Sequence, residues 1–188
     1  MNGRVVMLLM LSFPWVGACQ DQSESKSTEF QAMVRSYDVI TTLAGKGEED
    51  KGQNSWKPEF EGKPAPKVEL SNPHITMQDA AGNYYIADKQ SHRILKVDPS
   101  GVLTTFAGTG EGGFNRKAGR ATAVNLYFPN GLYVLPNGVV YILDNVNFRI
   151  RRVDQRGQLT TVFEDPDGFH HGRGLWVSPD EQLIYYVG

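Results

Sequence analysis

The sequence predicts an all-β fold built from a repeated unit of four antiparallel strands. Sliding the chain against itself by 56 residues aligns positions 64–106 with 120–162 without a gap, and 16 of these 43 positions are identical. The apolar runs inside each copy are short and separated by turn signals, which is the pattern of strands and not of helices. Four antiparallel strands per repeat are typical of a β-propeller blade, and the sequence contains about two and a half blades, an incomplete ring.

The first complete repeat shows how the strands are assigned. Its four strands are expected at residues 74–77, 84–88, 93–97 and 103–107. The segments 79–83 and 98–101 are rich in Asp, Asn, Pro and Gly, so they are expected to form turns.

Partial copies flank the complete ones. Residues 40–47 repeat as 103–110, and residues 131–136 recur as 174–179. We therefore expect a closing strand at 38–45, blades at 70–108 and 126–163, and a partial blade at 172–188. Because the closing strand has no partner blade in the sequence, we expect the chain to be a fragment or a truncated reading frame.

The N-terminal residues differ from the rest of the chain. Arg4 precedes an apolar run over 5–13, and small residues follow at 16–18, as in a secretory signal peptide at residues 1–18. The apolar character lasts about 15 residues, fewer than the roughly 20 of a spanning helix. Residues 19–37 are largely polar and are expected to be a flexible tether.

The segment Val16–Cys19 resembles the lipobox of bacterial lipoproteins. The resemblance implies that Cys19, the sole cysteine, carries the lipid and anchors the exported chain to the cell envelope, in the outer membrane or periplasm. The alternative is ordinary signal cleavage beside an incidental cysteine. The formal charge of −2, with basic residues dispersed among acidic ones, argues against a nucleic-acid partner.

A family resemblance follows from the second and third strands. The segment 82–88 followed by 92–98 resembles the NHL repeat, and so do 141–144 and 148–154. The glycine-rich segment from 107 resembles the insertion of bacterial NHL proteins. The resemblance implies a propeller of about six blades that acts as an interaction platform.

Regular charged pairs occur in both complete repeats. Asp88 and Asp144 each end a second strand, and Arg93 and Arg149 each begin the next. We expect each pair to cap its hairpin loop and to form an ion pair across it. Because catalysis needs a residue once, their repetition favours a structural role.

Two other features are expected to be structural. The run 108–113 superficially resembles a nucleotide-binding loop, but it follows a fourth strand and leads to no helical pattern. His170 and His171 lie near acidic residues, but their spacing fits no standard zinc pattern, so a surface loop is favoured.

The candidate ligand-binding residues come from position in the repeat. His74, Asn130 and Arg173 occupy corresponding positions at the starts of three first strands. First strands line the central channel of a propeller, so these side chains are expected near one mouth of the channel.

Two functions remain open. The preferred one is a binding scaffold without a cofactor, whose partner is an envelope protein, a glycan or a small ligand and whose membrane contact runs through Cys19. The alternative is a lactonase that depends on calcium or another divalent metal, because residues 128–132 and 174–180 are similar to segments of gluconolactonase-like propellers. In that resemblance, Asn130 matches a metal ligand. The other ligands have no clear counterpart, and Arg173 would repel a cation.

Overall fold

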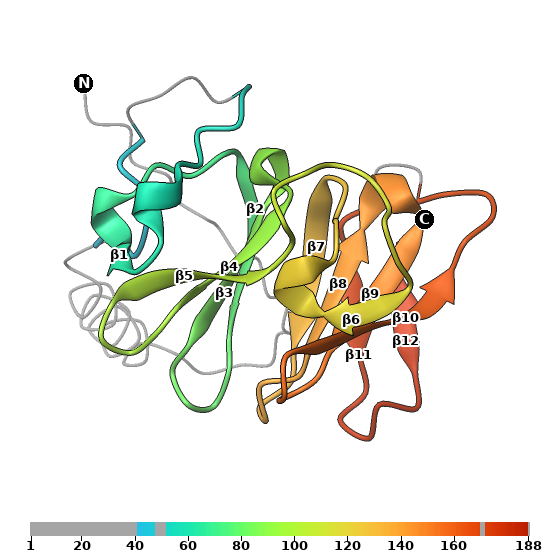
Figure 1. Cartoon of the computed structure of the whole chain (residues 1–188). Coiled ribbons are helices and arrows are strands. Elements are labelled where there is room, and N and C mark those ends of the chain that lie inside the picture. Colours follow the sequence, from blue (N-terminus) through green and yellow to red (C-terminus); the bar gives the residue numbers. More distant parts are fainter. Residues whose placement is uncertain (1–40, 48–51, 170–171, 188) are drawn as a thin grey trace, which may run out of the picture. The chain divides into compact units, whose positions relative to one another are not determined.

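Antiparallel sheets account for the regular structure of the chain (Figure 1). The computed structural model describes residues 41–47, 52–169 and 172–187. The expected signal peptide, Cys19, the tether, and His170 and His171 lie outside these residues. Among the described residues, no helix has the length and apolar character needed to cross a membrane.

Each complete repeat forms one five-stranded sheet. The first has the order β1-β5-β4-β3-β2 and the second β6-β10-β9-β8-β7. The strands of the first sheet are β1 (Lys63–Pro64), β2 (Pro73–Gln78), β3 (Tyr84–Asp88), β4 (Arg93–Val97) and β5 (Val102–Ala107). Those of the second are β6 (Ala118–Arg120), β7 (Pro129–Val134), β8 (Val140–Asp144), β9 (Arg149–Val153) and β10 (Gln158–Glu164).

The remaining elements are short. The strands β11 (Leu175–Val177) and β12 (Ile184–Tyr186) pair as the start of a third unit. The 3-10 turns are η1 (Pro58–Phe60), η2 (Ala65–Lys67), η3 (Lys89–Ser91), η4 (Ala121–Ala123) and η5 (Asn145–Asn147).

The predicted second and third strands of the first repeat, 84–88 and 93–97, have the observed bounds of β3 and β4. In the second repeat β8 is buried at every residue, because sheets cover both of its faces. The turn before each fourth strand is also repeated. Asp98 Oδ1 accepts hydrogen bonds from the N–H groups of residues 100 and 102, and Asp154 Oδ1 accepts those of residues 156 and 158. This shared turn chemistry explains why both copies fold alike.

Hydrophobic side chains hold the sheets face to face. One buried cluster combines Tyr85 and Ile94 of the first sheet with Leu132 and Ile142 of the second. A second cluster joins the second sheet to Val177 and its neighbours in the third unit. The inner strands β2 and β7 contact each other, and β7 contacts β11. The first strands of successive repeats therefore lie side by side, as in adjacent propeller blades.

The outermost strands β1 and β6 were not expected from the sequence. Residues 63 and 64 pair with β5, and residues 118–120 pair with β10. Beyond β1, the carboxylate of Glu61 accepts hydrogen bonds from the N–H and the hydroxyl of Thr105. Each blade therefore has the four predicted strands plus a short fifth one at its outer edge.

The predicted closing strand, 38–45, is not seen over its described part. Residues 41–45 form no strand, because no described strand lies beside them to complete a ladder. Gly45 instead donates its N–H to the carbonyl of Ala65 at 3.0 Å, as Gly108 does to Ala121 in the next repeat. Ala44 packs on the cluster that covers the other face of the first sheet. Residues 44 and 45 thus make contacts equivalent to those at the end of the fourth strand of the next blade, although they are not part of a strand.

Candidate functional site

The starts of the three inner strands bring the expected ligand-binding residues to neighbouring positions. His74 is the second residue of β2, Asn130 is the second residue of β7, and Arg173 lies two residues before β11. Since β2 contacts β7 and β7 contacts β11, the three positions follow one another along the inner side of the blades. We call His74, Asn130, Arg173 and the nearby Lys89 the strand-start site.

Asn130 connects the second blade to the third unit. Its side chain is 3% exposed, and its Nδ2 donates a hydrogen bond to the carbonyl of Gly172 at 3.2 Å. At the next residue, Gly131, a Cβ atom would lie 2.6 Å from the carbonyl oxygen of Arg173, so only glycine allows this approach. The Oδ1 atom of Asn130 is buried and has no hydrogen-bond partner among the described residues. The site therefore offers one acceptor whose bonding capacity is unused.

His74 is half-buried, and its Nδ1 is a second buried atom without a partner in the described chain. Burial lowers the pKa of His74, and the positive charges of Arg173 and Lys89 lower it further. The imidazole is therefore neutral at pH 7, with one nitrogen able to donate and one able to accept.

Positive charge dominates the strand-start site. Arg173 is exposed, and the ammonium of Lys89 lies 5.7 Å from the centre of the Phe128 ring. Within the described ranges, neither cation has an acidic partner at ion-pair distance. Two uncompensated cations beside unused polar atoms suit a ligand that carries negative charge or hydrogen-bond acceptors.

The same residues do not fit a divalent metal. Calcium requires six to eight converging oxygen ligands, and Asn130 Oδ1 is the single buried oxygen of this site with a free lone pair. Arg173 and Lys89 would repel the ion. In the described part of the chain, no three His, Cys, Asp or Glu residues are grouped to hold a metal.

The Asp and Arg pairs are arranged differently from the prediction. Asp144 and Arg149 face each other in the ladder, but the guanidinium that pairs with Asp144 is that of Arg151, at 3.5 Å. Arg149 lies 3.5 Å from Glu164 and stacks on Phe114. Side chains two residues apart share a sheet face, so Arg151 can compete for the carboxylate.

The first repeat has no equivalent cation. Leu95 holds the position of Arg151, and Asp88 Oδ1 accepts the N–H of Ser71 at 2.6 Å. Arg93 donates to the carbonyls of Ser91 and Thr109 instead of pairing with Asp88. Both carboxylates are fully buried and tie the hairpin to the segment that precedes the first strand.

Sequence reasoning did not identify two charged residues. Lys89 belongs to the strand-start site, and its only sequence signal is its place directly after the repeated Asp. Arg151 is completely buried, in a strand position that the pattern assigns to an apolar residue. The glycines of 108–113 behave as expected for a loop, since Gly108 and Gly110 have φ values of 93° and 94°.

Comparisons with known proteins agree with this architecture. The family model described as NHL repeat matches residues 126–153, so the chain contains an NHL repeat. It is 35% identical over 89 residues to Protein SUPPRESSOR OF QUENCHING 1, chloroplastic, of Arabidopsis thaliana, and 32% identical over 89 residues to NHL repeat-containing protein 2 of Gallus gallus. Each match covers 47% of this chain but only 8% and 12% of the respective relative.

A solved structure supports the fold. A crystal structure of a protein from Bacteroides thetaiotaomicron superimposes with a TM-score of 0.51 at 21% identity. The superposition covers 61% of this chain and 32% of that one. The all-β fold of β-propeller blades predicted from the repeat is thus confirmed.

Proposed function

We propose that the chain is a lipid-anchored, extracytoplasmic NHL-repeat scaffold that binds its partner at the strand-start site. The observation that carries this proposal is the combination of two cations, Arg173 and Lys89, with buried polar atoms of His74 and Asn130, none of which has an acidic or hydrogen-bonding partner, respectively, among the described residues. The partner is an envelope protein, a glycan or a small ligand, and the charge favours one with acidic groups.

Charge reversal tests the binding site. The full chain is titrated by NMR or calorimetry with a panel of acidic sugars and acidic glycans, together with their neutral counterparts. Arg173→Glu should weaken binding of the acidic ligands at least about tenfold, because it replaces an attraction by a repulsion. Arg156→Glu, on an exposed turn of the second sheet, is the matched control and should bind normally. Equal binding by both variants would refute the choice of site.

The anchor rests on the lipobox-like segment and is tested separately. Metabolic labelling with a radioactive fatty acid should mark the chain, and Cys19→Ser should abolish both the label and the recovery in the membrane fraction. Secretion of an unlabelled wild-type chain would show that the protein has no lipid anchor, and the scaffold function would then be proposed without it.

The second candidate is the metal-dependent lactonase, which the free Oδ1 atom of Asn130 favours. Asn130 would be the residue of this site that holds the metal, and the described residues supply no further ligands for it. Calcium-dependent lactone hydrolysis that is lost in Asn130→Ala and retained in Arg156→Glu would make the lactonase the preferred function in place of the binding scaffold.

A further inference from the structure

A second amide of the second blade, that of Asn145, has an unused oxygen like that of Asn130. Asn145 is half-buried, and its Oδ1 is a buried atom without a hydrogen-bond partner among the described residues. It is the first residue of η5, and at the 56-residue offset it corresponds to Lys89, the first residue of η3. The position that carries a cation of the strand-start site on the first blade therefore carries a polar amide on the second.

The turns η3 and η5 are structural copies of each other. The residue that closes each turn is left-handed, with φ values of 53° at His92 and 55° at Phe148. The turn η3 contacts β2, and the turn η5 contacts β7. Asn145 therefore has the same relation to the start of β7 as Lys89 has to the start of β2.

The polar groups of the site follow one another from blade to blade. The ammonium of Lys89 lies 5.7 Å from the centre of the Phe128 ring, so it reaches from η3 toward the start of β7. By the same relation, Asn145 lies on the side of β7 that faces the third unit. The charge of Arg173 is close enough to lower the pKa of His74 on the first blade. The strand-start site and Asn145 thus form one continuous group across three units.

These groups define the chemistry of a ligand that satisfies them. The Oδ1 atoms of Asn130 and Asn145 can only accept hydrogen bonds, so the ligand has to supply donors. A positively charged donor would be repelled by Lys89 and Arg173, which favours uncharged donors. Because both oxygens are enclosed, a hydroxyl suits them better than a peptide N–H, which has chain atoms on both sides. The two cations require an acidic group in the same ligand.

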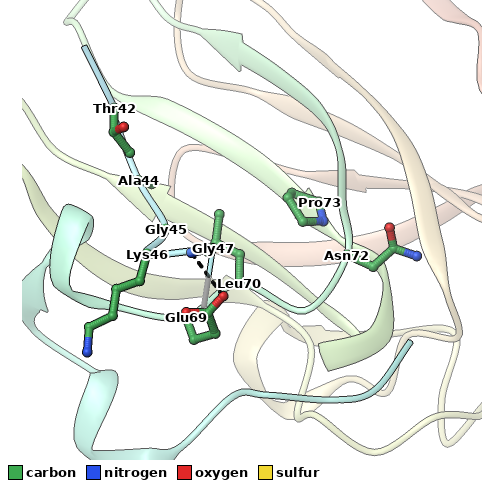
Figure 2. A pocket seen from close by; sticks show the side chains of 9 residues that line it. All are labelled: Thr42, Ala44, Gly45, Lys46, Gly47, Glu69, Leu70, Asn72 and Pro73. Carbon is green, nitrogen blue, oxygen red and sulfur yellow. Dashed lines mark hydrogen bonds between the residues drawn. The ribbon is translucent and has the colours of Figure 1, made fainter. Parts of the chain in front are cut away.

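The protein leaves space next to the site on the first blade. Asn72 and Pro73 directly precede His74 and line a cavity of about 530 Å³ beside residues 42–47 (Figure 2). Figure 2 shows these two residues at one end of the cavity, apart from the side chain of Lys46. A ligand bound at His74 therefore has room to continue past Pro73, as a chain of sugars does.

We propose that the strand-start site, together with Asn145, binds a uronic acid residue of a glycan, a sugar ring that carries hydroxyls and a carboxylate. The hydroxyls donate to the amide oxygens of Asn130 and Asn145, and the carboxylate accepts hydrogen bonds from Lys89 and Arg173. This inference rests on the proposed scaffold function and narrows its partner to an acidic glycan.

Three small ligands separate the contribution of the hydroxyls from that of the charge. The full chain is titrated by calorimetry with methyl glucuronide, with methyl glucoside, which lacks the carboxylate, and with cyclohexanecarboxylate, which lacks the hydroxyls. Methyl glucuronide should bind at least about tenfold more tightly than either of the others, because it alone supplies both kinds of group.

The outcomes distinguish this inference from the proposed function. Equal binding of methyl glucuronide and cyclohexanecarboxylate, with both weakened by Arg173→Glu, would overturn the uronic acid and leave a scaffold for acidic ligands. Equal binding of methyl glucuronide and methyl glucoside would also overturn it. If neither acid binds, or if Arg173→Glu binds both acids normally, the inference and the proposed function fail together.

The variant Asn145→Ala tests the added residue. Its side chain forms no hydrogen bond with the described residues, so truncation should leave the fold intact. It should weaken methyl glucuronide binding about fivefold, the effect of one lost hydrogen bond, and leave cyclohexanecarboxylate binding unchanged. Asn137→Ala, in the exposed turn after the other end of β7, is the matched control and should bind both ligands as the wild type does.

Two results would contradict the assignment. An unchanged affinity for methyl glucuronide in Asn145→Ala, or an equal loss for both acids, would show that this amide does not recognise a hydroxyl. Tighter binding of an acetylated Asp-Glu dipeptide than of methyl glucuronide would overturn the glycan in favour of an acidic peptide.

Discussion

The two repeated aspartates should respond to the same substitution in opposite ways. Asp88 is fully buried, and its Oδ2 has no hydrogen-bond partner within the described part of the chain. Burial raises its pKa to about 6 against the opposing hydrogen bonds of Ser91 and Ser71. A rise of about two units from the ordinary value of 3.8 corresponds to about 3 kcal/mol of stability lost on ionisation. Asp88→Asn removes that loss, while its unpaired NH₂ costs about 1 kcal/mol. We expect a net gain of about 2 kcal/mol in the free energy of unfolding at pH 7.5.

The gain must depend on pH with a defined sign. Because the pKa of Asp88 is higher in the folded chain than in the unfolded one, its contribution to stability is complete below about pH 4 and is lost as the pH rises through about 6. The stability of Asp88→Asn relative to the wild type should therefore fall by about 3 kcal/mol between pH 7.5 and pH 4, so that the variant is about 2 kcal/mol more stable above pH 7 and about 1 kcal/mol less stable below pH 4. Urea unfolding followed by circular dichroism at both pH values measures it.

Asp144→Asn is the matched comparison. Burial also raises the pKa of Asp144 to about 6, so the carboxylate is ionised at pH 7.5, but there it neutralises the completely buried Arg151. Without it a buried guanidinium lacks its counter-charge, and we expect a loss of about 3 to 5 kcal/mol. If Asp88→Asn lowers stability at pH 7.5, or if its effect is equal at pH 4 and 7.5, the reasoning from burial and the unpartnered oxygen is refuted.

Two further predictions concern the contacts between blades. Gly108→Ala places a methyl group 2.2 Å from the His92 carbonyl at a φ of 93° and should lower the free energy of unfolding by about 3 kcal/mol or more, measured by urea unfolding. Gly101→Ala, at φ 81° in open space, is the control and should cost about 1 kcal/mol. Arg152 pairs with Glu181 of the third unit at 2.6 Å, so a double-mutant cycle with Arg152→Ala and Glu181→Ala should give a coupling of about 1 kcal/mol in the free energy of unfolding. Zero coupling would show that the pair does not stabilise the contact between the second blade and the third unit.

The sequence predicted the repeated part of the fold because its signals are local. The strands at 84–88 and 93–97 lie between turn residues whose chemistry is the same in both copies, such as Asp98 and Gly101. The outer strands were missed because two or three residues that include Pro64 or Gly119 show no alternation. The closing strand was expected from residues 38–45, but a strand needs a neighbour as well as a suitable sequence.

The strand-start site could be located from the repeat, but its charge could not. Position in the repeat alone placed His74, Asn130 and Arg173 at the starts of adjacent inner strands. That Lys89 lies close enough to lower the pKa of His74 follows only from the folded loop. The ion pair of Asp144 was assigned to Arg149 because the ladder pairs the two residues, whereas the choice of Arg151 depends on how side chains fill one face of the sheet.

The short outer strands and the Glu61 carboxylate bear on how such a chain can change its number of blades. Each five-stranded sheet ends at its outer edge in a strand or side chain that occupies the backbone groups of β5 or β10. A gene duplication that copies one whole repeat therefore copies the protection of its edge as well. Blades can be added or lost as units in this way without creating an edge strand that has unpaired backbone groups. Neighbouring blades then contact each other only through the faces of their sheets.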